Sequence, residues 1–167
     1  DLANSFLTRE GIRVHSVETL CGVRMNTKVI DSECVCTELN ERGGVFRPSE
    51  IAELTEKFMS TDADVICLCG SIPQGVEKSV YNSIIRRANE AGVPTVLDCD
   101  GEALSLGLQA KPTLIKPNRR ELAGLIGVEE EKLKSFDFLV EACGKVFHAD
   151  GKACPIYACC ANKHFKC

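Results

Sequence analysis

The sequence contains no tryptophan, and only 5% of its 167 residues are aromatic. Proteins that bind single-stranded nucleic acid stack the bases on aromatic side chains, and those that bind duplexes need a basic surface. Here 20 lysines and arginines face 24 aspartates and glutamates, which gives a net charge of −4. The composition therefore argues against a nucleic-acid partner, while a local basic site for a small anion remains compatible with it.

Long apolar runs are also missing. No stretch of about 18 apolar residues occurs, so we expect no segment that spans a membrane. Residues 1–10 are charged and lack the apolar centre of a secretory signal. We therefore expect a cytoplasmic protein whose eleven cysteines are reduced. Three of them, Cys67, Cys69 and Cys99, lie in or beside apolar runs, and we expect them to be buried as small hydrophobic side chains.

The last part of the sequence is crowded with cysteine and histidine: Cys154, Cys159, Cys160, His164 and Cys167. The two separated ligand pairs of a zinc finger are absent. Two interpretations remain open for residues 150–167, a zinc site and an aberrant or disordered tail.

The first third of the sequence predicts a hairpin between two helices. Residues 1–11 have the pattern of a helix, and residues 12–17 have the pattern of a strand. Alternation of apolar and polar residues over 23–30 and 34–39 predicts an antiparallel hairpin with one polar face. Ser49 is the predicted N-cap of the next helix.

From residue 65 onward, strands and helices alternate. Apolar strands are predicted over residues 65–69, 94–98 and 113–115, and the first is apolar enough to be buried on both faces. Helices are predicted to follow, one ending near residue 90, one over 101–108 and one from 121. Short strand–helix connections indicate right-handed crossovers and a parallel sheet, hence an α/β fold.

Three loops follow the carboxyl ends of these strands, where parallel sheets bind ligands: residues 70–75, 98–101 and 116–121. In the third loop, Asn118 and Glu121 have the spacing of a capping box. Lys116 precedes free amides at a helix start, which attract anions, and a carboxylate there can hold Mg²⁺ through water. Capping and phosphate binding are compatible interpretations of this segment.

The other two loops have weaker signals. Gly70 to Gly75 has the composition of a simple turn, but its glycines allow close approach of a ligand and Ser71 offers a hydroxyl for a sugar. It is neither a Walker loop nor a GxGxxG motif. Asp98 and Asp100 could perform acid–base or metal chemistry, or Asp100 could cap the next helix.

On the hairpin, Arg24 and Asn26 share one face because they are two residues apart in a strand. An arginine in that position usually only keeps the strand solvated. Its guanidinium is equally suited to hold a phosphate with two hydrogen bonds.

Together these segments resemble the PfkB-type (ribokinase-like) carbohydrate kinases, in the branch of 1-phosphofructokinase and tagatose-6-phosphate kinase. The resemblance covers roughly residues 10–147. The segments that carry it are VRMNTK at 23–28, TELNE at 37–41, CGSIPQG at 69–75, LDCDGEAL at 97–104 and IKPNRREL at 115–122.

The resemblance implies a three-layer Rossmann-like parallel sheet with a β-hairpin lid, and ATP-dependent phosphorylation of a ketohexose phosphate. It implies that Arg24 and Asn26 bind the substrate's existing phosphate and that Gly70 and Ser71 bind the sugar. It further implies that Lys116 and Asn118 contact ATP, that Glu121 also helps to hold Mg²⁺, and that the lid at residues 12–41 forms a homodimer. Fructose 1-phosphate, fructose 6-phosphate and tagatose 6-phosphate are all candidate substrates.

Two motifs of these kinases do not occur in the sequence. One is the first strand with a sugar-binding aspartate and a Gly-Gly-Lys-Gly-like segment, and the other is the Gly-Ala-Gly-Asp motif, whose aspartate is the catalytic base. We therefore expect an incomplete kinase core made of residues 1–11 and 49–149, with no catalytic residue in this chain. The alternative is a non-catalytic remnant that binds a sugar phosphate or dimerises. A nucleoside or ribose kinase is disfavoured, because Arg24 suits a substrate that already carries a phosphate.

Overall fold

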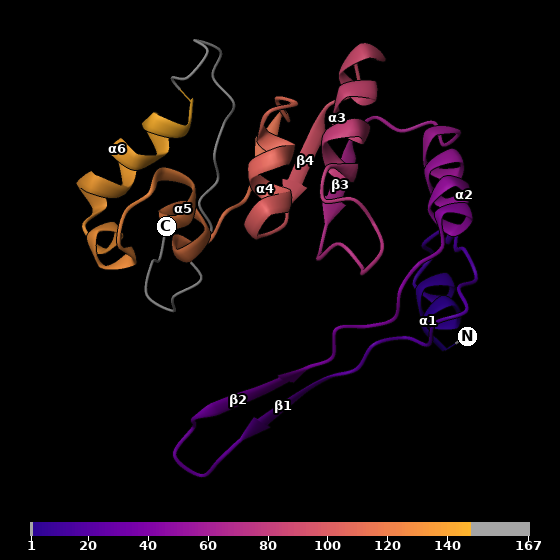
Figure 1. Ribbon diagram of the computed structural model, residues 1–167, viewed down its shortest axis with the longest axis horizontal. Coiled ribbons are helices and arrows are strands. Elements are labelled where there is room, and N and C mark those ends of the chain that lie inside the picture. The colour runs from indigo at the N-terminus through magenta and orange to yellow at the C-terminus, as the bar shows by residue number, and fades with distance from the viewer. Residues whose placement is uncertain (1, 148–167) are drawn as a thin grey trace. The chain divides into compact units, whose positions relative to one another are not determined.

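The computed structural model describes residues 2–147, and these form two compact units. The first unit takes in the chain up to residue 62 together with residues 73–76. The second takes in residues 63–72 and the described chain from residue 77 onward. Figure 1 shows the order of the elements along the chain. The cysteine-rich segment 150–167, with its predicted zinc site or tail, lies outside the described residues.

The first unit consists of two helices and a hairpin. Its elements are α1 (Leu2–Arg9), β1 (Asn26–Ile30), β2 (Cys36–Asn40) and α2 (Pro48–Met59). The two strands pair in antiparallel register, with Lys28 opposite Glu38, so the predicted hairpin is confirmed. Every residue of both strands is exposed. The hairpin therefore buries no side chain in the described part of the chain.

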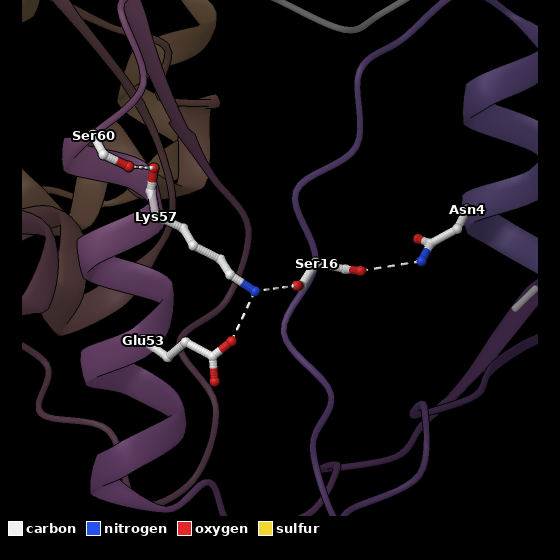
Figure 2. Close-up of polar contacts among 5 residues, drawn as sticks. All are labelled: Asn4, Ser16, Glu53, Lys57 and Ser60. Atoms are coloured by element: carbon white, nitrogen blue, oxygen red, sulfur yellow. Dashed lines mark hydrogen bonds and ion pairs between the residues drawn. The ribbon is translucent and has the colours of Figure 1, made fainter.

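The predicted strand at residues 12–17 is wrong. These residues have no strand partner, and polar side chains of α1 and α2 contact Ser16 in this segment instead (Figure 2). Lys57 Nζ donates to the carbonyl of Ser16 at 2.9 Å and pairs with Glu53 at 2.7 Å, while Asn4 Nδ2 donates to Ser16 Oγ at 3.1 Å. An extended segment between two helices satisfies its backbone in this way without joining a sheet.

The predicted N-cap at Ser49 is also wrong, by two residues. Arg47 is the N-cap of α2, because Pro48 already occupies the first helical position, where its fixed φ is favourable and its missing N–H costs nothing. The Glu50 carboxylate accepts the backbone N–H of Arg47 at 2.7 Å and that of Leu20 at 3.1 Å. These bonds, with the Arg47 amide first, lower the pKa of Glu50 below its ordinary value.

The second unit contains the predicted parallel sheet, which has three strands in the order β3-β4-β5. The strands are β3 (Ile66–Cys69), β4 (Thr95–Asp98) and β5 (Leu114–Ile115), and the helices that follow them are α3 (Val80–Glu90), α4 (Gly101–Leu108) and α5 (Arg119–Ile126). Leu97 at the centre of β4 is fully buried, as is Ile85 of α3. A Cβ on Gly107 of α4 would lie 2.6 Å from the Leu97 side chain, so this glycine permits the close helix–sheet contact.

The prediction that β3 is buried on both faces is wrong for one of the two faces. Leu68 is 5% exposed, but Cys67 and Cys69, which point to the opposite face, are exposed. β3 is an outer strand of the described sheet, and alternation places the partly buried Ile66 and the buried Leu68 on its covered side. The prediction of burial is wrong for these two cysteines and confirmed for Cys99, which is 7% exposed.

A second core lies beyond α5. The 3₁₀ helix η1 (Glu130–Lys134) and α6 (Phe136–Phe147) pack with α5 around five buried residues: Leu122, Ala123, Leu133, Leu139 and Ala142. Gly127 ends α5 in the left-handed region at φ 70°, a conformation that glycine adopts at little cost. Among the described helices, none is both long enough and apolar enough to cross a membrane.

Candidate functional site

The carboxyl ends of the three parallel strands bring Gly70, Asp98 and Lys116 together. The Gly70 N–H donates to the Asp98 carbonyl at 3.0 Å. Lys116 Nζ lies 3.0 Å from Asp98 Oδ2, and the two groups form an ion pair that remains partly exposed. The three loops predicted from the sequence therefore meet at one edge of the sheet, and Lys116 has an internal anionic partner that sequence reasoning did not assign.

Asn118 and Glu121 form the predicted capping box at the start of α5. Asn118 Oδ1 accepts the Glu121 N–H at 2.9 Å, and Glu121 Oε2 accepts the Asn118 N–H at 2.8 Å. A third bond joins Asn118 Nδ2 to Glu121 Oε1 at 2.5 Å. The capping interpretation is confirmed. Each carboxylate oxygen can accept a further bond, so the cap leaves Glu121 able to act as a ligand.

A pocket of about 510 Å³ opens beside this capping box. It lies between the first turns of α4 and α5, and its walls are formed by Asp100, Gly101, Leu104, Ser105, Asn118, Arg120, Glu121, Gly124 and Leu125. Asp100 is the N-cap residue of α4, yet its side chain makes no capping hydrogen bond. The proposed cap by the Asp100 carboxylate is therefore wrong, and this group lines the pocket together with Glu121 and the cationic Arg120.

The buried thiol of Cys99 reports the electrostatics of this region. Burial, followed by the charges of Asp100, Asp98 and Glu121, raises the pKa of Cys99 to about 12. The thiol is thus neutral at physiological pH and is no nucleophile. The carboxylates that disfavour a thiolate would favour a cation at the same place. The donors available here, carboxylate and amide oxygens, are those that Mg²⁺ prefers.

The loop that begins at Gly70 is held by a residue that sequence reasoning missed. The hydroxyl of Tyr81, on α3, donates to the carbonyls of Cys69 and Gly70 at 3.1 and 3.2 Å. Gly70 has φ 94°, in the region that favours glycine. Ser71 is exposed. No pattern in the sequence marks Tyr81, because its role depends on where α3 turns back along β3.

The last residues of the same loop contact the segment that follows the hairpin. Phe46 N–H donates to the Gln74 carbonyl at 3.0 Å, and Gln74 Nε2 donates to the Gly43 carbonyl at 3.0 Å. Gly75 has φ 83°, and a Cβ there would lie 2.7 Å from the Val45 side chain. These contacts lie within the first unit and fix residues 73–76 beside residues 43–46.

Asn26 is the first residue of β1, whereas Arg24 lies two residues before it, so the prediction that both belong to one strand is wrong for Arg24. Both residues are exposed and belong to the first unit. Asn26 pairs with Asn40 across the strands. The other predicted binding residues, Gly70, Ser71, Lys116, Asn118 and Glu121, belong to the second unit. The structure brings Gly70 and Lys116 to one edge of the sheet through Asp98. The binding roles of all seven residues remain predictions.

Comparison with known proteins places this arrangement in a family context. Residues 3–151 match the model of the pfkB family carbohydrate kinases. The chain is 35% identical over 106 residues to the 1-phosphofructokinase of Haemophilus influenzae, an alignment that covers 62% of this chain and 34% of that protein.

Solved structures agree. The crystal structure of Escherichia coli phosphofructokinase-2 in complex with fructose-6-phosphate has a TM-score of 0.75 at 26% identity, covering 87% of this chain and 48% of that one. A possible 1-phosphofructokinase from Thermotoga maritima has a TM-score of 0.63 at 26% identity, covering 74% of this chain and 40% of that one. The predicted fold class is confirmed as ribokinase-like α/β with a hairpin, and the chain spans about half the length of these structures or less.

Proposed function

Because the chain belongs to the pfkB family of carbohydrate kinases, we propose that the enzyme it represents phosphorylates a ketohexose phosphate with ATP and Mg²⁺. Fructose 1-phosphate, fructose 6-phosphate and tagatose 6-phosphate are the candidate substrates. The relatives named above include a 1-phosphofructokinase and a phosphofructokinase-2. Epimers and positional isomers of one sugar differ by few pocket contacts, so the choice among the three is left to experiment.

The observation that carries this proposal is the meeting of three strand ends at one sheet edge. A sugar loop, a carboxylate and a lysine are joined there by the Gly70–Asp98 hydrogen bond and the Lys116–Asp98 ion pair. Phosphoryl transfer is accelerated mainly by positioning and by neutralising charge, and these groups suit that chemistry. The loop at residues 70–75 is not a GxGxxG motif, so these groups do not form a dinucleotide-binding site of that type.

For the nucleotide, Lys116 and Asn118 contact the ATP phosphates and Glu121 holds Mg²⁺ through water. When bound, the metal neutralises charge on the phosphate oxygens. The fit rests on the carboxylates of Asp100 and Glu121 in one pocket. After burial, which is the largest cause, the charges of these two carboxylates also raise the pKa of Cys99. The ion pair with Asp98 neutralises Lys116 before ATP binds. When ATP binds, Lys116 would exchange part of this interaction for one with a phosphate group.

For the sugar, Gly70 and Ser71 contact the hydroxyl groups, and Arg24 with Asn26 binds the phosphate that the substrate already carries. The exposed apolar side chains of the hairpin, which include Met25, Val29 and Leu39, suit contact with a second copy of the chain. A homodimer formed through this hairpin would bury them, and burial of apolar area stabilises an interface.

The 167 residues contain no Gly-Ala-Gly-Asp motif, and we propose that the isolated chain has negligible kinase activity. A positioned base typically contributes about 10²–10⁴-fold to a rate, and a hole of amide donors adds about 10²–10³-fold. This absence favours a second candidate function for the isolated chain, in which it binds a sugar phosphate or dimerises without catalysis.

The test is calorimetric titration of the purified chain with each of the three sugar phosphates, with ATP and Mg²⁺, and with adenosine and ribose. We expect binding of at least one sugar phosphate, weakened about tenfold or more in Arg24→Ala. Arg13→Ala is the matched control, because Arg13 is likewise an exposed arginine of the first unit and has no proposed role in binding. Binding of adenosine or ribose with none of any sugar phosphate would overturn the proposed substrate class.

Turnover is measured separately by coupling ADP formation to a dye-linked assay with the same sugars. We expect no turnover by the 167-residue chain. A rate near 1 s⁻¹, which is within the ordinary range for enzymes, would show that the chain contains its own base.

A further inference from the structure

Tyr81 is the one residue in the described chain whose side chain bonds to the backbone of the proposed sugar loop where that loop leaves β3. It lies in the first turn of α3, and its half-buried ring projects back toward the strand end. Its hydroxyl group lies 3.1 Å from the Cys69 carbonyl and 3.2 Å from the Gly70 carbonyl. The single hydroxyl proton is shared between the two carbonyls in a three-centre hydrogen bond, so one side chain contacts two consecutive peptide groups.

The orientation of these two peptide groups decides which backbone N–H and C=O groups of the loop are available to a ligand. A trans peptide is planar, and its N–H points opposite to its C=O. The peptide between Cys69 and Gly70 has both ends fixed, since its carbonyl accepts from Tyr81 and its N–H donates to the Asp98 carbonyl at 3.0 Å. The peptide between Gly70 and Ser71 has only its carbonyl fixed, by Tyr81.

The Ser71 N–H is therefore aimed away from Tyr81. Within residues 2–147 it has no hydrogen-bond acceptor. Ser71 is exposed, so this backbone donor and the serine hydroxyl beside it can donate to a sugar oxygen. Among the described residues, only the Tyr81 hydrogen bond holds the Gly70–Ser71 peptide in this direction. Gly70, at φ 94°, is free to rotate away once that bond is lost, because glycine crosses between backbone regions at little cost.

We infer that Tyr81 is a positioning residue for the sugar site, and that its hydroxyl group fixes the Gly70–Ser71 peptide so that the Ser71 N–H points to the sugar. This inference rests on the proposed function, and it adds a backbone donor and the side chain that orients it. Burial raises the pKa of Tyr81 above its ordinary value of 10.0. The hydroxyl group thus remains protonated, as a donor must, throughout the physiological range.

The test compares Tyr81→Phe with the wild-type chain. The variant keeps the ring and removes only the hydroxyl group. Ser83→Ala is the matched control, because it removes a hydroxyl from the same helix that bonds within the helix, to the Ser79 carbonyl at 3.4 Å. The first measurement, without sugar, is NMR of the carbonyl carbons of Cys69 and Gly70 and of the Ser71 amide.

We expect all three resonances to shift in Tyr81→Phe and none to shift in Ser83→Ala. The second measurement is calorimetric titration with fructose 1-phosphate, fructose 6-phosphate and tagatose 6-phosphate, and separately with ATP and Mg²⁺. Affinity for the sugar phosphate should fall about fivefold, the usual value of one hydrogen bond, while affinity for ATP stays within about twofold. This split would not result from a merely structural role.

Three results would overturn the inference. They are unchanged resonances in Tyr81→Phe, shifted resonances with unchanged sugar affinity, and a parallel loss of sugar and ATP affinity. A wild-type chain that binds none of the three sugar phosphates overturns the proposed function and the sugar role of Tyr81 with it. The sugar-free NMR result separates the two failures, because it tests the Tyr81 hydrogen bonds whether or not any sugar binds.

Discussion

The hairpin and the parallel sheet show how differently two β structures in one chain can be stabilised. All ten residues of β1 and β2 are exposed, so the hairpin is held by its backbone ladder and by cross-strand side chains. In the parallel sheet, Leu97 and Ile115 are both 0% exposed and are packed under helices. A two-stranded hairpin alone is marginal in water, whereas a sheet covered by helices carries its own core. The hairpin should therefore be the part whose order depends most on a partner.

The largest expected effect comes from removing core volume from the sheet. Leu97→Ala should destabilise the second unit by about 2–5 kcal/mol, because it removes buried methyl groups and leaves a cavity beside Gly107 and Ile85. Urea unfolding followed by circular dichroism measures the loss. Leu39→Ala is the matched control in the hairpin, where Leu39 is 59% exposed, and we expect a loss below about 0.5 kcal/mol. Equal losses in the two variants would contradict the contrast between the regions.

The next effect concerns the segment that follows the hairpin. Gly75→Ala should destabilise the first unit by about 1–3 kcal/mol. The new Cβ would lie 2.7 Å from the Val45 side chain and 2.9 Å from the Phe46 carbonyl oxygen, at a positive φ that alanine disfavours. Hydrogen exchange of the Phe46 amide, which donates to Gln74, reports the loss directly.

Gly22→Ala is the control for that substitution. Gly22 lies before the hairpin, and a Cβ there meets no atom within 4 Å. We expect no change in the exchange of the Phe46 amide. Slow exchange retained in Gly75→Ala would show that residues 43–46 are held by contacts other than those with residues 73–76.

A smaller loss of stability is expected from substitutions at the N-termini of two helices in the second unit. Asn118→Ala should destabilise it by about 0.5–2 kcal/mol, because the Asn118 side chain accepts the Glu121 N–H. Asp100→Ala, at the start of α4, should cost less than about 0.5 kcal/mol, since the Asp100 side chain makes no capping bond. Thermal unfolding of both variants measures the difference. A larger loss in Asp100→Ala would mean that the pocket carboxylate stabilises α4 in another way.

The two regions also differed in how far the sequence predicted them. Periodicity gave the order of strands and helices, because alternation over residues 34–39 and apolar runs such as 65–69 are local signals. The meeting of Gly70, Asp98 and Lys116 followed from topology, since parallel strands end at one edge. The exposure of Cys67 could not be predicted, because it depends on which elements cover that face of β3 and not on the strand's own composition.

The contacts at the candidate site were likewise predictable from the sequence only in part. The capping box of Asn118 and Glu121 is a four-residue signal and was found, whereas Tyr81 and the Lys116–Asp98 ion pair depend on the positions of separate elements. A helix start can also mislead, as Ser49 did when Pro48 set the first turn. Local chemistry therefore predicts residues that act on near neighbours in the sequence, and the fold decides the rest.

The smallest expected effect is the pH dependence of the hairpin, which comes from the ion pair between Lys28 and Glu38. The Lys28 Nζ group lies 2.7 Å from the Glu38 carboxylate, across the two strands. The hydrogen bond from Lys28, followed by one from Asn40, lowers the pKa of Glu38 below its ordinary value of 4.5. A carboxyl with a lowered pKa in the folded state stabilises above its unfolded pKa. That contribution is lost as the pH falls from about 4.5 through the folded value.

Hydrogen–deuterium exchange of the hairpin amides between pH 3 and pH 6, corrected for intrinsic exchange rates, measures this loss. We expect protection to decrease on acidification and the decrease to disappear in Glu38→Gln. Glu33→Gln, which removes a carboxylate from the turn of the same hairpin, should behave like the wild-type chain. The Lys28 and Glu38 side chains are both exposed, so added salt should weaken the pH dependence of protection. Protection that does not change with pH would show that backbone hydrogen bonds alone hold the strands, and would deepen the contrast with the buried sheet.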